Sequence, residues 1–229
     1  RFLILLFIIS GCSDNNQSYF PLNSIKSWSY KVVIQPEIDK ETIYKKTKIS
    51  LGKKSLEIDK KKKSLYPFLR EDGSVFFYKN YKDGIYRHGY AFARDKTIKL
   101  ENKKRIVLPM PEKVGKKWAV ESKTFLILKR YPYYDYRATT NFEIKYQIIS
   151  KDEIVNTPLG KFKDCLLVKG IGKTQFIGDS EIGSIEINIT SNEWYAKGIG
   201  LVKSIREEKT DSDLFGTTVM TQVIEHFEK

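Results

Sequence analysis

Residues 74–92 read Ser-Val-Phe-Phe-Tyr-Lys-Asn-Tyr-Lys-Asp-Gly-Ile-Tyr-Arg-His-Gly-Tyr-Ala-Phe, and this stretch decides the fold. Two runs rich in aromatic residues, 74–78 and 85–92, flank Lys82-Asp83-Gly84. An Asp-Gly pair between two alternating runs is a strong signal for a two-stranded hairpin, because glycine and aspartate adopt the backbone angles of a tight turn. The stretch therefore predicts a pair of antiparallel strands.

The same pattern extends over the rest of the chain, with short β-rich runs separated by turn residues and no capped segment of helical period. Strands are expected at residues 28–34, 42–51, 118–128, 138–149, 165–176, 184–196, 200–209 and 217–227. Residues 151–157 suit a short strand or a turn. Several of these runs are long, as expected of strands in a deeply curved sheet. The pattern predicts a mostly β, single domain over residues 21–229. Its large antiparallel curved sheet forms an open or incomplete barrel, with few short helices.

The start of the chain has the pattern of an export signal. Residues 2–9 are an unbroken apolar run behind Arg1, too short for the roughly 20 residues of a membrane-spanning helix. Ser10, Gly11 and Cys12 follow, and then a polar stretch with little to pack. We predict a signal peptide over residues 1–11 and a polar tether over residues 12–20.

The ending at Cys12 resembles the lipobox of bacterial lipoproteins. In that family the signal is cleaved before the cysteine, whose thiol receives a diacylglycerol, so the resemblance implies lipidation of Cys12 and attachment to a membrane through acyl chains such as palmitate. Ser13, rather than Asp, comes next, which in that family favours the periplasmic face of the outer membrane. The expected location is the cell envelope.

Composition supports a folded domain, with 41% hydrophobic and 13% aromatic residues, and the net charge is +13. Lysine far outnumbers arginine and is spread along the chain. Base readers and phosphate clamps rely on arginine forks, so nucleic acid is not a predicted partner. The lysines suit solvated strand faces better than a dedicated anionic-surface patch, although the pattern allows both.

No catalytic or metal-binding constellation is present in the sequence. Two histidines, His88 and His226, cannot supply a usual zinc site, and no nucleophile or phosphate-loop motif occurs. Cys165 is expected to be a buried small hydrophobe rather than a reactive thiol. A hydrolase that uses carboxylates such as those of residues 207–213 is the least supported class, because solvated charge explains them. We predict a protein that is not an enzyme and has no cofactor and no metal.

Two motifs in the last third of the chain carry a family resemblance. Residues 158–168 fit P-x-G-x-F-x-x-C-x-x-V, and residues 194–204 fit W-Y-A-x-G-x-G-x-V-x-S. Together they resemble uncharacterised exported bacterial lipoproteins related to the lipoprotein-carrier (LolA/LolB-like) architecture. The resemblance implies a curved antiparallel sheet around a hydrophobic cavity and no established activity. Mechanically, Pro158 and Gly160 predict a tight turn, and Gly198 with Gly200 a connection of positive φ.

A second, weaker pattern is the shared spacing from Pro21 to Trp28 and from Pro111 to Trp118. Each segment predicts a turn that leads into a strand whose tryptophan fills the core.

Two groups of residues are candidates for contact with a ligand or a partner. Tyr86, His88, Tyr90 and Phe92 alternate and are expected to share one sheet face, as core or as the lining of a cavity. The loop bounded by Arg130 and Arg137 is dense in aromatic residues, which suits carbohydrate stacking, a membrane interface, a protein contact or packing on the barrel mouth. These aromatic residues are Tyr131, Tyr133, Tyr134 and Tyr136.

The sequence thus predicts a lipid-anchored envelope lipoprotein that acts as a non-catalytic binding module for a hydrophobic ligand or an envelope component. The alternative is a structural or assembly lipoprotein with a filled core, which binds a partner protein through its surface.

Overall fold

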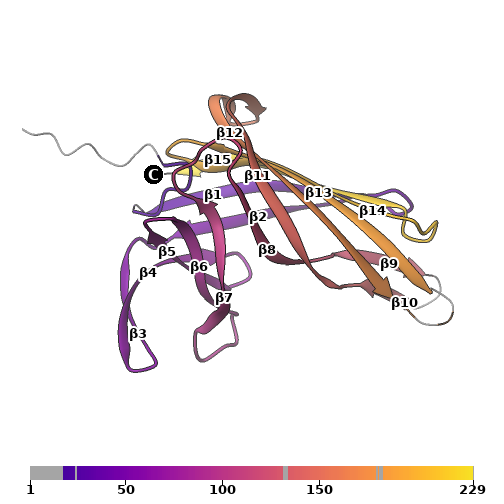
Figure 1. The fold of residues 1–229 in the computed structure, drawn as a ribbon, viewed down its shortest axis with the longest axis horizontal. Helices are drawn as coiled ribbons and strands as arrows, with labels where there is room; N and C mark the ends of the chain where they lie inside the picture. The colour runs from indigo at the N-terminus through magenta and orange to yellow at the C-terminus, as the bar shows by residue number, and fades with distance from the viewer. Residues whose placement is uncertain (1–17, 24, 131–133, 179, 181–182, 229) are drawn as a thin grey trace, which may run out of the picture.

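A computed structural model describes residues 18–23, 25–130, 134–178, 180 and 183–228; for residues 104, 127–130 and 134–138 it describes the backbone alone. They form one 13-stranded antiparallel sheet and a two-stranded sheet, β9–β10 (Figure 1). The order in the large sheet is β7-β6-β5-β4-β2-β1-β15-β14-β13-β12-β11-β8, with β3 paired to β4. The mostly β fold is confirmed, and the described residues contain none of the few short helices we expected.

The strands are β1 (Lys26–Pro36), β2 (Thr42–Ser50), β3 (Lys54–Ile58), β4 (Lys61–Arg70), β5 (Val75–Tyr81), β6 (Gly84–Ala91), β7 (Lys99–Pro109), β8 (Lys117–Lys123), β9 (Leu126–Arg130), β10 (Tyr134–Ala138), β11 (Asn141–Thr157), β12 (Gly160–Ile177), β13 (Ser184–Ala196), β14 (Gly200–Thr210) and β15 (Thr217–Glu228).

The hairpin predicted from residues 74–92 is present as β5–β6. Tyr81 pairs with Gly84, so Lys82 and Asp83 form the two-residue turn. Gly84 also lets the next strand approach, because a Cβ there would stand 2.6 Å from the carbonyl oxygen of Leu108 on β7. The turns predicted from the two motifs are confirmed as well: Thr157 pairs with Gly160, and Ala196 pairs with Gly200.

Other strands differ from the prediction in their limits. The run predicted over residues 118–128 divides into β8 and β9, while residues 141–157 form the single long strand β11. β3, β4 and β7 were not predicted, because their lysine-rich sequences lack a clear apolar alternation. They are stabilised as strands by pairing with their neighbours, which outweighs a weak local preference.

The large sheet curls until its two edge strands, β7 and β8, approach each other (Figure 1). Side chains join this seam. The Lys103 ammonium lies 2.6 Å from the Glu121 carboxylate, and the Arg105 guanidinium donates a hydrogen bond to the Glu121 carbonyl oxygen. Because the strand order ends at β7 and β8 without pairing them, the sheet is an incomplete barrel, as the sequence predicted.

The largest hydrophobic cluster fills one part of the concave interior. Trp28 is buried at its centre, and its indole NH donates to the Ile199 carbonyl oxygen at 2.7 Å. Trp118, the tryptophan of the matching segment, is only half-buried and stacks on Tyr146. Cys165 is fully buried in the same cluster, and burial raises the pKa of its thiol to about 11, which confirms its interpretation as a hydrophobe.

The N-terminal end of the described chain also packs in this cluster. Tyr19 and Phe20, which the sequence analysis placed in the tether, are 3% and 7% exposed. The Phe20 ring contacts the rings of Phe68 and Tyr78. The packed domain therefore includes these two residues, because their rings bury apolar area that a tether would leave in water. Residues 1–17, with the signal peptide and Cys12, lie outside the described residues.

Gly170 on β12 permits close packing on the concave face. A Cβ at this position would stand 2.6 Å from Cε1 of Tyr146 on β11. The Tyr146 ring cannot easily move, because it stacks on Trp118 with 5.5 Å between ring centroids and donates a hydrogen bond to Glu193 at 3.2 Å. The close approach of the Tyr146 ring to β12 therefore requires glycine at position 170.

We expect Gly170→Ala to lower the free energy of unfolding by roughly 1–3 kcal/mol, since overpacking a filled core costs about this much. The measurement is chemical unfolding followed by tryptophan fluorescence. Lys169→Ala, an exposed change at the preceding residue, is the control and should have little effect. Equal stability of the Gly170→Ala variant and the native chain would contradict this account of the packing.

Candidate functional site

The concave face of the sheet holds two neighbouring cavities. The first, the basic cavity, has a volume of about 260 Å³ and is lined by side chains from β1, β2, β4, β5, β6, β14 and β15. Only the inside of the curl can bring so many strands together. The second, the aromatic cavity, has a volume of about 530 Å³ and lies towards β7, β8 and the start of β11. Phe76 and Arg87 line both, so the two cavities adjoin.

Lys48 on β2 is the central cation of the basic cavity. Its Nζ lies 4.8 Å, 5.1 Å and 5.3 Å from the ring centroids of Trp28, Phe68 and Phe20. Cations are attracted to the faces of aromatic rings at such distances. Among the described residues no hydrogen bond or ion pair reaches this ammonium group. Lys48 is thus held by aromatic faces alone.

Three further cations line the basic cavity. Lys46 donates a hydrogen bond to Gln222 at 3.1 Å. The Arg70 guanidinium lies 5.4 Å from the Phe76 ring centroid, and its buried Nε has no hydrogen-bond partner among the described residues. Arg87 lies over the other side of the site, 5.0 Å from the Phe76 ring centroid, and forms an ion pair with Glu101.

The described lining of the basic cavity contains four cationic side chains and no carboxylate. Burial lowers the pKa of Lys48 to about 7, and repulsion from Lys46 and Arg70 adds to the effect. Burial and Arg70 also lower the pKa of Lys46. Apart from Arg87, which pairs with Glu101, the cavity therefore holds positive charge that no carboxylate of its lining neutralises, which is a costly arrangement in a half-buried place.

The lowered pKa of Lys48 has a consequence for stability. The unfolded chain binds a proton on this lysine up to about pH 10.5, whereas the folded chain releases it near pH 7. Between these values the unfolded state binds more protons, so this lysine makes the free energy of unfolding rise with pH. Five groups from the surrounding strands face it: Tyr30 (β1), Lys46 (β2), Arg70 (β4), Tyr78 (β5) and Arg87 (β6).

We expect Lys48→Met to remove the rise in the free energy of unfolding between about pH 7 and pH 9.5. This range lies below that in which tyrosines ionise. Urea unfolding at a series of pH values measures it, and the Lys45→Met variant, changed at an exposed residue of the same strand, should keep the native slope. Parallel pH profiles for Lys48→Met and the native chain would show that the lysine is not desolvated.

The structure separates the four predicted contact residues of β6 and its end. Tyr78 pairs with Arg87 and Phe77 with Gly89, so His88 is the extra residue of a β-bulge. Tyr90 and Phe92 line the aromatic cavity with Arg87, whereas Tyr86 bonds to Asp83 at 2.7 Å and packs edge-on to Tyr81. The expectation of one shared face was wrong, because a bulge shifts the alternation by one residue.

His88 lies beside lysines of the neighbouring strands. Burial lowers the pKa of its imidazole, and Lys63 and Lys79 lower it further. Its Nε2 is buried and has no hydrogen-bond partner among the described residues. Neither cavity has His88 in its lining.

The side chains of the four tyrosines predicted as contacts in the loop between Arg130 and Arg137 are not described by the structure. Tyr131 and Tyr133 lie outside the described residues, and Tyr134 and Tyr136 lie on β10, of which the structure describes the backbone alone. They remain predicted contacts.

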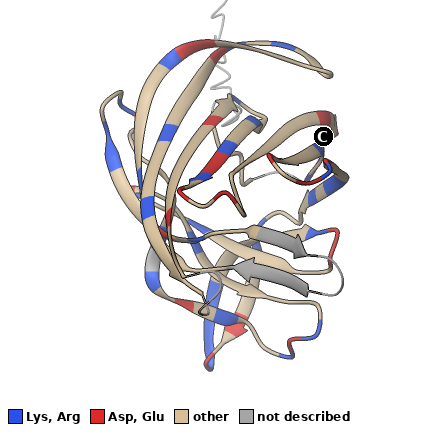
Figure 2. Ribbon diagram, turned by 90° about the vertical axis from the view of Figure 1, so that its right-hand side faces the viewer, with Lys and Arg blue, Asp and Glu red and all other residues tan. Residues whose placement is uncertain are grey.

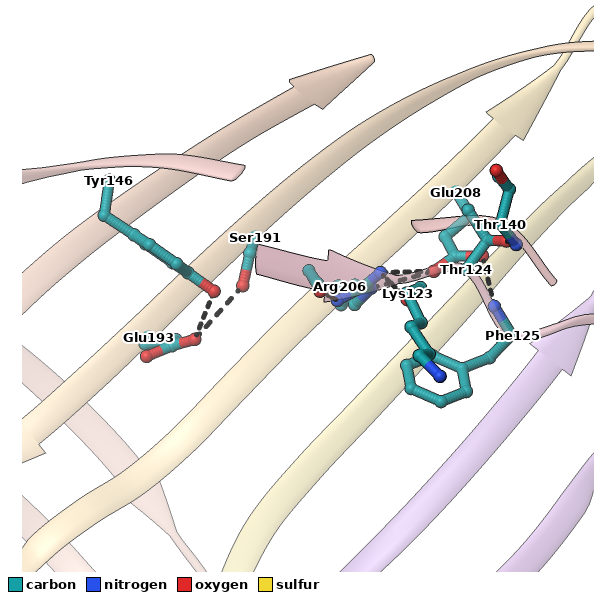
Figure 3. Close-up of polar contacts among 10 residues, drawn as sticks. Lys123, Thr124, Phe125, Thr140, Tyr146, Ser191, Glu193, Arg206 and Glu208 are labelled. Carbon is teal, nitrogen blue, oxygen red and sulfur yellow. Dashed lines mark hydrogen bonds and ion pairs between the residues drawn. The ribbon is translucent and has the colours of Figure 1, made fainter. Parts of the chain in front are cut away.

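A second set of polar side chains on the concave face is satisfied internally (Figure 3). Glu193 accepts hydrogen bonds from the hydroxyl groups of Tyr146 at 3.2 Å and Ser191 at 3.4 Å. Glu208 is buried, lies 2.6 Å from Nη2 of Arg206, and accepts the backbone NH of Phe125 at 3.0 Å. Because these groups have partners, they stabilise the fold, whereas the Lys48 ammonium group and the Nε of Arg70 in the basic cavity have no hydrogen-bond partner among the described residues.

Basic side chains are distributed over many strands of the curled sheet and its loops (Figure 2). Sequence reasoning missed the small group that converges inside. Lys46 and Lys48 alternate on one strand, and this shared face was the available signal. Their meeting with Arg70 and Arg87 depends on the strand order.

Within the described residues no group of three or more His, Cys, Asp or Glu side chains is placed to hold a metal ion. No described helix is long and apolar enough to cross a membrane.

The fold and the cavities define a curled antiparallel sheet that encloses a basic and aromatic interior. No protein-family model matches the chain, and no curated protein matches it significantly. Two solved structures are similar over 93% of this chain. One is a Bacteroides fragilis protein assigned as exported, with a YmcC-like fold (15% identity, 100% of that chain, TM-score 0.41), and the other is a Parabacteroides distasonis protein assigned as a lipoprotein (16% identity, 99% of that chain, TM-score 0.40).

A LolA superfamily protein of Nitrosomonas europaea is similar over 93% of this chain and 89% of its own, with 8% identity and a TM-score of 0.25. These neighbours are of the kinds that the two sequence motifs resemble, exported lipoproteins and a LolA superfamily protein.

Proposed function

We propose that this protein is a lipid-anchored, non-catalytic binding protein of the cell envelope that holds a hydrophobic ligand in its concave face. The observation that supports the proposal best is the aromatic cavity. Phe76, Tyr90, Phe92 and Phe125 contribute to a lining that the sheet leaves unfilled. Ligand sites in proteins are concave and combine apolar walls with polar groups that orient the ligand. In this cavity the four rings stand beside charged side chains, namely Arg87, Glu101, Arg105, Glu121 and Lys123.

The anchor in this proposal is Cys12, acylated after removal of residues 1–11, on the periplasmic face of the outer membrane. Six residues separate Cys12 from the buried Tyr19. The seven steps from Cys12 to Tyr19 span at most about 25 Å when extended, so the domain would stay close to the bilayer. Lys151 and Lys197 lie beside the Tyr19 ring, at 5.8 Å and 5.7 Å from its centroid. Such lysines would favour this face towards anionic headgroups.

Replacement of the predicted lipidation residue tests the anchor. We expect Cys12→Ser to abolish incorporation of radiolabelled palmitate and to move the protein from the membrane fraction to the soluble fraction. Stable anchoring needs several acyl chains, which this residue would carry. The matched control is Ser10→Ala, which keeps the cysteine. Unaltered labelling and fractionation of the Cys12→Ser variant would refute the anchor and leave the cavity open to its own test.

The neutral fluorescent probe N-phenyl-1-naphthylamine tests the cavity. We expect the chain from residue 12 onward, with Cys12→Ser and thus the whole described fold, to bind it saturably. The double variant Tyr90→Ser/Phe92→Ser should weaken binding about tenfold, because two rings that line the cavity are lost. Tyr81→Ser on the same hairpin, outside both cavity linings, is the control. Absence of saturable binding in the unmutated chain would refute the proposed function.

The second candidate is a structural or assembly lipoprotein that binds a partner protein through its surface. A groove of about 550 Å³ along β8, β11 and β12 favours it, because Ile149 and Ile171 there are 40% and 57% exposed beside Lys145 and Lys169. Exposed apolar groups of this kind suit a protein interface. This candidate predicts that the fluorescent probe finds no saturable site inside the sheet, so the same titration distinguishes the two.

A further inference from the structure

Positive charge is concentrated in the basic cavity and is only partly balanced there. Four cations face it, and its described lining contains no carboxylate. Two carboxylates next to the cavity partly balance its arginines: Glu101 pairs with Arg87, and Glu71 lies 3.9 Å from Arg70 in a partly exposed position. Among the described residues, Lys46 and Lys48 form no ion pair. Like charges brought together in a half-buried place repel one another, so an anion in the cavity would relieve the cost.

The donors are also held in place before any ligand arrives. Three aromatic rings lie against the Lys48 ammonium, and the guanidinium groups of Arg70 and Arg87 lie 5.4 Å and 5.0 Å from the Phe76 ring centroid. Side chains fixed in this way lose little freedom when they bind a ligand. The buried Nε of Arg70 and the Lys48 ammonium group are donors that lack a hydrogen-bonding partner among the described residues.

We propose that the basic cavity binds the anionic head of an amphiphile whose apolar chain occupies the adjoining aromatic cavity. This inference rests on the proposed function and names the class of its ligand: one apolar chain that ends in a carboxylate, sulfate or phosphate group. Lys48 and Arg70 donate to the head, and Arg87 stands where head and chain meet, because it lines both cavities.

The volumes of the two cavities agree with a ligand whose head lies in the basic cavity and whose chain lies in the aromatic cavity. A water molecule takes about 30 Å³ in the liquid, so the basic cavity, at about 260 Å³, admits a group several times larger, such as a carboxylate or a phosphate. The aromatic cavity has about twice that volume and places Tyr90 and Phe92 against its contents, with ring centroids 5.1 Å apart. The head would therefore meet the cations of the basic cavity, and the chain would lie against the aromatic rings, beside the charged side chains that complete the lining of the aromatic cavity.

The test is displacement of N-phenyl-1-naphthylamine by octyl sulfate, octanol and sodium sulfate at pH 6.0, where Lys48 carries its charge. The protein is the chain from residue 12 onward with Cys12→Ser. Octyl sulfate and octanol share the same chain and differ in charge, and sodium sulfate supplies the head alone. We expect octyl sulfate to displace the probe at a concentration about tenfold or more below that of octanol, as a charge-assisted hydrogen bond implies. Sodium sulfate should leave the probe bound.

Two variants test whether the preference for octyl sulfate over octanol arises in the basic cavity. Lys48→Met keeps a long apolar side chain against the three rings and should reduce the advantage of octyl sulfate over octanol about tenfold, with octanol unaffected. Arg70→Gln should act in the same direction, which guards against one variant that folds poorly. Lys45→Met removes the same charge from an exposed residue of β2 and should keep the full advantage.

Equal displacement by octyl sulfate and octanol would overturn the inference while leaving the proposed function intact. The same holds if Lys48→Met and Arg70→Gln both keep the native preference. Displacement by sodium sulfate as efficient as by octyl sulfate would replace the amphiphile with a free anion and would also overturn it. No saturable binding of the probe would instead reject the proposed function itself.

Discussion

A single sheet that curls on itself must fill its own concave face, and this constraint shapes the whole molecule. No described helix packs into the curl, so side chains from the strands alone occupy the interior. Large rings do most of the filling. Trp28 and Tyr30 of β1 and Phe68 of β4 pack in the largest cluster, so two strands supply these rings. Where the rings end, cavities remain, and these give the fold a place for a ligand.

Charged groups in the interior are stabilised in two different ways. Arg206 and Glu208 neutralise each other and also bond to the backbone near the start of β9, so they join strands that lie far apart in sequence. Lys48 instead relies on ring faces, which lower the cost of its charge without consuming its N–H donors. The first arrangement stabilises the fold, and the second leaves donors available. This difference is why we assign binding to the basic cavity and structure to the other group.

Local patterns predicted the elements, whereas the site depends on how the elements meet. The hairpin at Asp83-Gly84 and the turn at Gly160 follow from neighbouring residues, so they were predictable. The faces of Tyr86 and His88 were not, because a bulge of one residue reverses the alternation and no local signal marks it. The basic cavity needed strand order as well. Lys48 and Arg70 are partners in the β2–β4 ladder, and β3, which lies between them in sequence, was itself unpredicted.

The seam between β7 and β8 gives the sheet one boundary unlike the others. Every other neighbouring pair in the large sheet shares a ladder of backbone hydrogen bonds, while this pair is joined by side chains of Lys103 and Arg105 with Glu121. Exposed ion pairs are weak and are screened by salt, whereas a ladder opens only with loss of many bonds at once. Widening of the curl is therefore easiest along this line, which borders the aromatic cavity through Arg105 and Glu121. By this argument, raising the ionic strength is expected to loosen the seam and to let water and solutes exchange more readily with the interior.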